Sequence, residues 1–155
     1  DIYQEYLDNT VKKFNATYQR RIRPYLLPIL DDPDLSVLPQ NQFGFVFAWN
    51  VFDYFPLEHV KAFLSQCFDL MRPGGVMMFS YNNAEHHMNA AYVEEGFMSW
   101  MPRGLLIQLV TQLGFEIINT ESKEEVIHWI EIRKPGELKT VKAHQVMGEI
   151  ININR

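Results

Sequence analysis

FGFVFAWNVFDYFP at residues 43–56 and MRPGGVMMFSY at residues 71–81 are the two stretches that decide the fold class of this chain. The run from Phe43 to Trp49 is apolar on both alternating faces, which predicts a strand covered on both sides, as in a parallel sheet. Pro56 is well placed to open a helix, and apolar residues keep helical spacing from Leu57 to Met71. Strand, helix, tight turn and strand form a βαβ unit, whose crossover we expect to be right-handed.

The segment before this unit predicts a helix and then a loop. From Tyr3 to Ile22 the apolar residues recur at steps of three or four positions, which is typical of an amphipathic helix. Prolines and aspartates punctuate the stretch from Ile29 to Gln42, so we expect loop structure there. At most a short edge strand fits around Leu26 to Leu30.

The segment after the unit predicts a further helix and a hairpin. Residues 82–101 have an irregular pattern, which favours a lid or a short helix. A helix is expected from Pro102 to the closing Gly114. Residues 115–121 and 125–133 alternate like half-buried strands around a short polar connection, which indicates an antiparallel hairpin.

Composition excludes several classes of protein. The 155 residues, 47% of them hydrophobic, suit one folded domain, and a net charge of -5 argues against nonspecific nucleic-acid binding. No apolar run approaches the roughly 20 residues of a membrane span. The single cysteine, Cys67, cannot form an internal disulfide, and no cluster of Cys and His completes a metal site. We therefore expect a cytoplasmic protein without a membrane segment.

Two motifs carry a family resemblance. MRPGG at Met71 to Gly75 stands between a helix and a buried strand, and QLGFEIINTE at Gln112 to Glu121 precedes a strand that ends in Lys-Pro-Gly. Together with the order of elements, they resemble the C-terminal two-thirds of a Rossmann-like (class I) S-adenosylmethionine-dependent methyltransferase over residues 1–136. Residues 137–155 would then be a tail or docking segment.

This resemblance implies an α/β fold, with a mostly parallel sheet, helices on both faces and a C-terminal antiparallel hairpin. The family's first strand and glycine-rich cofactor loop are not among the printed residues, so we expect them to lie outside this sequence, or else the domain is partial. A second departure is Gly44, because the family usually has Phe-Asp-x-Val where this chain has Phe43, Gly44, Phe45 and Val46.

The resemblance also implies where S-adenosylmethionine would bind. Asp1 would accept hydrogen bonds from the ribose hydroxyls, although it could instead cap the following helix. The acid near the adenine would be Asp31 or Asp34, and the sequence does not separate them. Ligands of open α/β sheets gather at the carboxyl ends of strands, which selects the segment from Asn50 to Tyr54. The full set of expected cofactor contacts is Asp1, Ile2, Asp31, Asp34, Leu35, Asn50, Val51 and Asp53.

Two residues are candidates for the chemistry. Tyr54 could stabilise a sulfonium through the face of its ring, as could the aromatic residues Phe55, Phe97 and Trp100. His86 follows the second buried strand, where it could take a proton from a hydroxyl or amine of the acceptor. Methyl transfer otherwise needs alignment and desolvation more than a catalytic triad.

The leading interpretation is therefore methyl transfer from S-adenosylmethionine to an unidentified acceptor, most simply a small molecule. The alternative is a non-catalytic, methyltransferase-like scaffold or subunit-binding module. For either interpretation, a homo-oligomer or a larger assembly is a possible state of the protein. A dinucleotide-dependent oxidoreductase ranks last, because that class should not end in the antiparallel hairpin.

Overall fold

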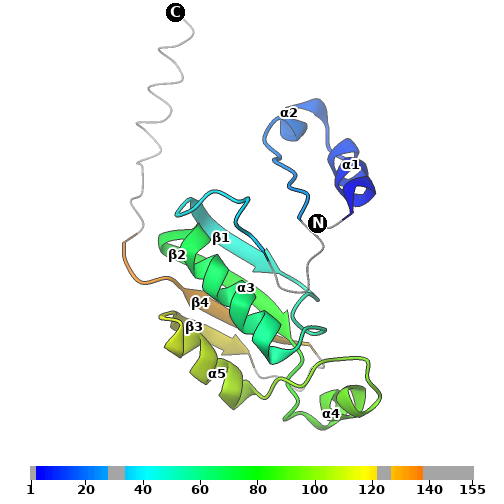
Figure 1. Ribbon diagram of the computed structural model, residues 1–155, viewed down its shortest axis with the longest axis vertical. Helices are drawn as coiled ribbons and strands as arrows, with labels where there is room; N and C mark the ends of the chain where they lie inside the picture. The colour runs from blue at the N-terminus through cyan, green and yellow to red at the C-terminus, as the bar shows by residue number, and fades with distance from the viewer. Residues whose placement is uncertain (1–2, 28–33, 122–126, 138–155) are drawn as a thin grey trace, which may run out of the picture.

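The computed structural model describes residues 3–27, 34–121 and 127–137. Its centre is a four-stranded sheet of order β1-β2-β4-β3 (Figure 1). The strands are β1 Phe43–Ala48, β2 Met71–Tyr81, β3 Glu116–Glu121 and β4 His128–Arg133. β1 runs parallel to β2, whereas β4 is antiparallel to both β2 and β3. The expected α/β class and the C-terminal hairpin are confirmed, and the parallel pairing is confined to β1 and β2 in the described sheet.

Helix α3 Leu57–Leu70 connects β1 to β2, as the apolar spacing predicts. It buries Val60, Leu64, Cys67 and Leu70 against the sheet. Burial raises the pKa of the Cys67 thiol to about 12, which fits a structural side chain rather than a nucleophile.

The expected turn at Arg72 to Gly75 lies inside β2 as a bulge, rather than before the strand. Phe43 pairs with Met71, but Phe45 already pairs with Val76, so β2 has extra residues at this point. Gly74 has φ 73°, a left-handed conformation that favours glycine. β2 therefore resumes its pairing only after the glycines.

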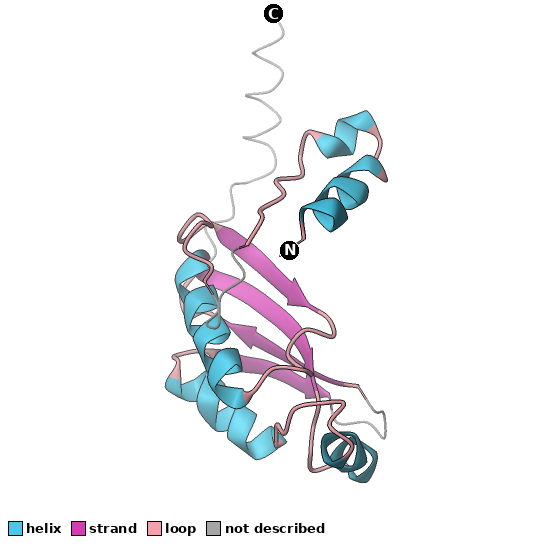
Figure 2. Ribbon diagram, turned by 45° about the vertical axis from the view of Figure 1, so that its right-hand side comes forward, coloured by secondary structure: helices cyan, strands magenta, loops and turns pink. Residues whose placement is uncertain are grey.

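Helices α3 and α5 Arg103–Gln112 cover the same face of the sheet (Figure 2). The core there includes Met77, Phe79, Ile130 and Ile132, each at most 1% exposed. On the opposite face, Phe45 and Phe47 of β1 are 59% and 54% exposed, and Phe47 stacks on Trp129 at 5.7 Å between ring centroids. The prediction that β1 is covered on both sides is thus wrong for the described chain, because one helical layer suffices to bury only alternate residues.

The end of α5 is closed by glycine, as predicted. The Gly114 N–H donates to the Thr111 carbonyl, and the Phe115 N–H donates to the Val110 carbonyl. These two bonds form a Schellman motif, with Gly114 at φ 91°. The irregular segment before α5 contains one short helix, α4 His87–Glu94, which agrees with the expected lid or short helix.

The N-terminal region is not one helix. It divides into α1 Gln4–Lys12 and α2 Ala16–Gln19, because Asn15 accepts a hydrogen bond from the Tyr18 N–H and so begins a new helix. Neither helix contains a buried residue, and both stand apart from the sheet in Figure 1.

Some expectations fall outside the described residues. The possible strand at Leu26 to Leu30 is described only as far as Leu27, without regular structure, and the tail from residue 138 onward is not described. None of the helices in the described ranges has the length and apolar character that crossing a membrane requires.

Candidate functional site

The loop after β1 is fixed by a hydrogen-bonded chain to the end of β2. The Asn50 N–H donates to Ser80 Oγ at 2.8 Å, and Ser80 Oγ donates to Asp53 Oδ2 at 2.9 Å. Asn50 adopts φ 51°, a left-handed conformation that asparagine tolerates better than most residues. One serine hydroxyl therefore holds the loop at two points.

Asp53 is a buried group in this arrangement, with 3% of its surface exposed. Burial raises the pKa of its carboxyl, and the hydrogen bond from Ser80 acts in the opposite direction. Its neighbours face the solvent instead. Asn50 is exposed, while Val51 and Tyr54 are 38% and 55% exposed. Asp53 thus shapes the loop, whereas Asn50, Val51 and Tyr54 are available to a ligand.

A second loop, residues 96–101, is bonded to the first. The Ser99 N–H donates to the Asp53 carbonyl at 2.8 Å. The Ser99 carbonyl accepts a hydrogen bond of 3.0 Å from Asn82 Nδ2, just beyond β2. Asn82 is 1% exposed, and its Oδ1 has no hydrogen-bond partner within the described part of the chain. Both loops are consequently anchored at the carboxyl ends of the parallel strands.

Asn83 fixes the start of α5 beside the same edge. Its Oδ1 accepts hydrogen bonds from the backbone N–H groups of Glu85 and Arg103. The Arg103 guanidinium donates to Thr120 Oγ1 on β3. These contacts join the end of β2 to the hairpin.

His86, which the sequence analysis predicts to be a proton acceptor, lies directly before α4. It is half-buried, and its Nδ1 has no hydrogen-bond partner among the described residues. Its ring centroid is 4.7 Å from that of His87 and 5.6 Å from that of His128. Tyr81 lies 6.0 Å from His128, and burial raises the pKa of Tyr81 to about 12, while the charge of Arg103 lowers it. This aromatic cluster lies at the end of β2, where Tyr81 pairs with His128 of β4.

The remaining expected cofactor residues lie elsewhere or are not described. Asp34 Oδ1 accepts a hydrogen bond from the Ser36 N–H. The side-chain hydrogen bond from Ser36 and this backbone bond lower the pKa of the Asp34 carboxyl. The Leu35 N–H donates to Gln66 Oε1 in the second half of α3, and Leu35 is buried beside an apolar crevice of about 250 Å³. The crevice also contacts Phe43, at the opposite end of β1 from Asn50. Asp1, Ile2 and Asp31 fall outside the described residues.

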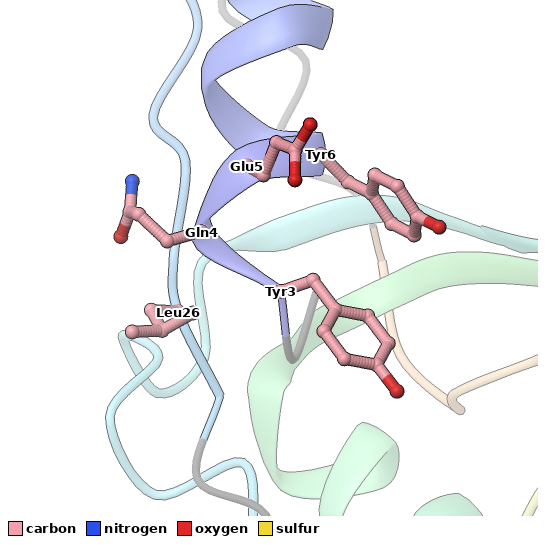
Figure 3. A pocket seen from close by; sticks show the side chains of 5 residues that line it. All are labelled: Tyr3, Gln4, Glu5, Tyr6 and Leu26. Atoms are coloured by element: carbon pink, nitrogen blue, oxygen red, sulfur yellow. The ribbon is translucent and has the colours of Figure 1, made fainter.

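The start of α1 borders a separate hollow of about 310 Å³, lined by Tyr3, Gln4, Glu5, Tyr6 and Leu26. Figure 3 shows Tyr3 and Tyr6 projecting from the same side of the helix, with Gln4 on the side of Leu26. Tyr3, the first residue that lines this hollow, directly follows Asp1 and Ile2 in the sequence.

The sequence predicted a ligand-binding loop after β1 from topology, but the residues that fix this loop were not predicted. Ser80 is a polar residue inside the apolar run VMMFSY, and Asn82 and Asn83 follow that strand at once. These three polar positions could have predicted the hydrogen bonds that fix the loop, because buried polar groups at a strand end usually have hydrogen-bond partners. Within the described ranges, no group of His, Cys, Asp and Glu is arranged to hold a metal ion.

Comparison with known proteins identifies the family. Residues 6–120 match the methyltransferase domain family. No curated protein matches the chain by sequence. Among solved structures, a possible exported protein from Bordetella parapertussis superposes with a TM-score of 0.68 at 11% identity, covering 88% of this chain and 52% of that one.

Two further structures are methyltransferases. Magnesium protoporphyrin IX methyltransferase from Synechocystis PCC 6803, with bound S-adenosylhomocysteine, has a TM-score of 0.59 at 15% identity and covers 86% of this chain and 62% of that one. The N-methyltransferase NodS from Bradyrhizobium japonicum WM9, in complex with S-adenosylhomocysteine, has a TM-score of 0.57 at 12% identity, with 88% and 65% covered. The chain thus spans half to two-thirds of the length of these structures. With this fold and a match that extends over most of its residues, the chain belongs to the methyltransferase domain family and has the Rossmann-like class I fold.

Proposed function

We propose that this chain forms part of an S-adenosylmethionine-dependent enzyme that transfers a methyl group to a small-molecule acceptor. The observation that carries the proposal is the family match over residues 6–120, which includes both loops at the carboxyl ends of β1 and β2. Two of the similar solved structures hold S-adenosylhomocysteine, the product that this cofactor leaves. A cytoplasmic location belongs to the proposal, and the buried free thiol of Cys67 is compatible with it.

The residues after β1 fit the proposed cofactor. Asn50 offers an exposed amide at a loop whose backbone Ser80 holds in place, and Val51 offers an exposed apolar side chain beside it. The exposed ring of Tyr54 can stabilise a positive charge through its π face. When bound, S-adenosylmethionine would supply the activated methyl group. Asp53 contributes by holding the loop, because its carboxylate is buried against Ser80.

The ribose and adenine contacts are assigned from the family resemblance. Asp1 would accept from the ribose hydroxyls, with Ile2 beside it, and the hollow between Tyr3 and Leu26 lies next to them along the chain. The acid on the adenine side would be Asp31 or Asp34, with Leu35 beside it, and Leu35 borders the apolar crevice that Phe43 also lines.

His86 is the proposed proton acceptor for the methyl-accepting hydroxyl or amine. Its position before α4 and beyond β2 puts the imidazole at the same edge as the two loops. An imidazole is suited to this role because its ordinary pKa lies near neutral pH.

Calorimetric titration of the complete polypeptide with S-adenosylhomocysteine tests the proposal. We expect saturable binding that Asp1→Ala weakens about tenfold, whereas Asp8→Ala, at an exposed position of α1, leaves it unchanged. Single-turnover methylation, once an acceptor is known, should fall in His86→Gln without a change in cofactor affinity. A folded protein that binds neither S-adenosylmethionine nor S-adenosylhomocysteine would instead support the scaffold alternative.

A further inference from the structure

Large hydrophobic side chains face the solvent on both loops of the carboxyl edge. In the loop after β1, Val51 and Tyr54 are 38% and 55% exposed. In residues 96–101, Phe97 and Trp100 are 65% and 56% exposed. We call these four residues the platform. Solvent-exposed apolar groups that gather in one place commonly mark a binding surface.

A hydrogen bond between the two loops brings the backbones of Tyr54 and Trp100 close together. The Ser99 N–H donates to the Asp53 carbonyl at 2.8 Å. Tyr54 and Trp100 directly follow these two residues in the chain, so their backbones are neighbours. Asn82 Nδ2 also donates to the Ser99 carbonyl, so both the N–H and the carbonyl of Ser99 are hydrogen-bonded. A surface held in this way loses little conformational entropy when a ligand binds.

The platform has almost no charge. Among residues 49–56 and 96–101, Asp53 is the single charged side chain in the sequence, and it is 3% exposed. A charged ligand would therefore find no exposed ionic partner in these loops. A flat apolar ligand would find aromatic rings on which to stack.

We infer that the methyl acceptor is an uncharged, planar, aromatic molecule that binds on the platform formed by Val51, Tyr54, Phe97 and Trp100. This inference rests on the proposed function, because it names the substrate class for the same carboxyl edge. The platform lies beside Asn50, the proposed cofactor contact, and follows the end of β2 that leads to His86. Open α/β sheets bind their ligands at this edge.

The test uses naphthol as a planar, uncharged probe and NMR spectroscopy of the complete polypeptide. We expect naphthol to shift the amide signals of Val51 to Tyr54 and of Phe97 to Met101. Hydroxynaphthoate, which adds one carboxylate to the same rings, should bind roughly tenfold more weakly. A probe that binds without changing these amides overturns the inference, as does the absence of naphthol binding.

Variants provide a second readout. Tyr54→Ala and Trp100→Ala should each weaken naphthol binding roughly tenfold, because each removes one stacking surface. Tyr18→Ala is the matched control, since Tyr18 on α2 is also 55% exposed, and Phe47→Ala controls for the apolar face of the sheet. Both controls should stay within about twofold of the natural protein. If Phe47→Ala abolishes binding while Tyr54→Ala and Trp100→Ala do not, or if hydroxynaphthoate binds the loops as tightly as naphthol, the inference is wrong.

Failure of the proposed function is read separately, by titration with S-adenosylhomocysteine. A protein that binds naphthol on the platform but not S-adenosylhomocysteine contradicts the proposed function and removes the acceptor role from the platform. A protein that binds S-adenosylhomocysteine but shows no naphthol shifts at the two loops contradicts this inference alone.

Discussion

Gly75 is a residue whose missing side chain is required by its surroundings. A Cβ atom at this position would lie 2.9 Å from both the Arg72 and the Phe43 carbonyl oxygens. Both contacts are with backbone, which cannot swing aside as a long side chain can. The Lys134 N–H also donates to the Gly75 carbonyl, so the backbone is held from the other side by the chain after β4. The RPGG motif thus serves close backbone approach as well as the bulge in β2.

Gly75→Ala should therefore lower the free energy of unfolding by about 1–3 kcal/mol, the usual cost of forcing extra atoms into a packed site. Gly104→Ala is the matched control, because the nearest atom to its Cβ position is 3.6 Å away and the residue lies in the first turn of α5. That substitution should stabilise the protein by about 0.5–1 kcal/mol, since alanine loses less entropy than glycine in a helix. Urea denaturation measures both, and equal effects would contradict the argument.

Gly44 stands where the family usually has an aspartate, and the Arg72 side chain lies beside it. A Cβ atom there would lie 2.6 Å from Arg72 Nη2, so the guanidinium occupies the space that a side chain would take. The sequence signalled the departure but not what fills the space, because Arg72 reaches Gly44 only when β1 and β2 are paired. Ser80 was overlooked for the same reason, since its carboxylate partner is 27 residues away in the chain.

At the scale of elements, Asp53 links the loop after β1 to β2 and to the second loop through hydrogen bonds. Its burial makes the stability of the fold depend on pH. The pKa of Asp53 is raised above 3.8 in the folded protein because burial disfavours the charged form. The folded protein therefore holds this proton more tightly than the unfolded chain does. Its contribution to stability is fully present below about pH 3.8 and is lost as the pH rises through the folded-state pKa.

Asp53→Asn has no charge to bury, so its unfolding free energy relative to the natural protein should increase as the pH rises from about 4 to about 7. Urea denaturation at several pH values measures this difference. Asp69→Asn, at an exposed position near the end of α3, is the control and should not produce the same trend. A constant difference between Asp53→Asn and the natural protein at all pH values would show that the carboxyl does not titrate differently on folding.

Lys134 joins the last strand to the end of α3. Its Nζ donates to the Phe68 carbonyl at 2.7 Å, to the Met71 carbonyl at 2.9 Å and to Asn41 Oδ1 at 3.2 Å, and it lies 4.6 Å from the centre of the Phe68 ring. A cation at this end of a helix also complements the helix dipole.

Lys134→Met keeps much of the side-chain volume but leaves these acceptors without their donor. We expect the unfolding free energy to fall by about 2 kcal/mol, in the range for hydrogen bonds to charged groups. Lys61→Met, on the exposed side of α3, should change it by less than about 0.5 kcal/mol. Thermal unfolding followed by circular dichroism compares the two, and similar losses would mean that the three contacts do not stabilise the fold.

Which elements could be predicted from the sequence depended on how local their signals are. The helices from Leu57 and from Arg103 were predictable because each follows a proline and keeps apolar spacing, and Gly114 closes the second. The break at Asn15 was missed because the apolar spacing continues across it, while the cap depends on a single side chain. The exposure of Phe45 and Phe47 could not be read from FGFVFAW, since an apolar run does not say how many layers cover it.

At the scale of the whole molecule, the core and the N-terminal helices make unequal contributions. The core lies between the sheet and the layer of α3 and α5, and within residues 3–27 Leu27 is the one hydrophobic residue that packs against it. α1 and α2 bury no residue, although Tyr3, Tyr6 and Tyr18 are more than half exposed. The proposed ribose contact, Asp1, nevertheless lies a few residues before α1, which begins at Gln4. Stability and the proposed ribose contact should therefore depend on different parts of the chain.

Removal of residues 1–25 separates the two. Because Leu27 and the whole sheet remain, the unfolding free energy should change by less than about 1 kcal/mol, a small part of a domain's total stability. Affinity for S-adenosylhomocysteine should fall about tenfold or more, since Asp1 and the hollow lined by Tyr3 and Tyr6 are lost. Urea denaturation and calorimetry of the same sample measure the two quantities. A loss of several kcal/mol would show that α1 and α2 belong to the cooperative core, whereas unchanged affinity would place the ribose contact elsewhere in the protein.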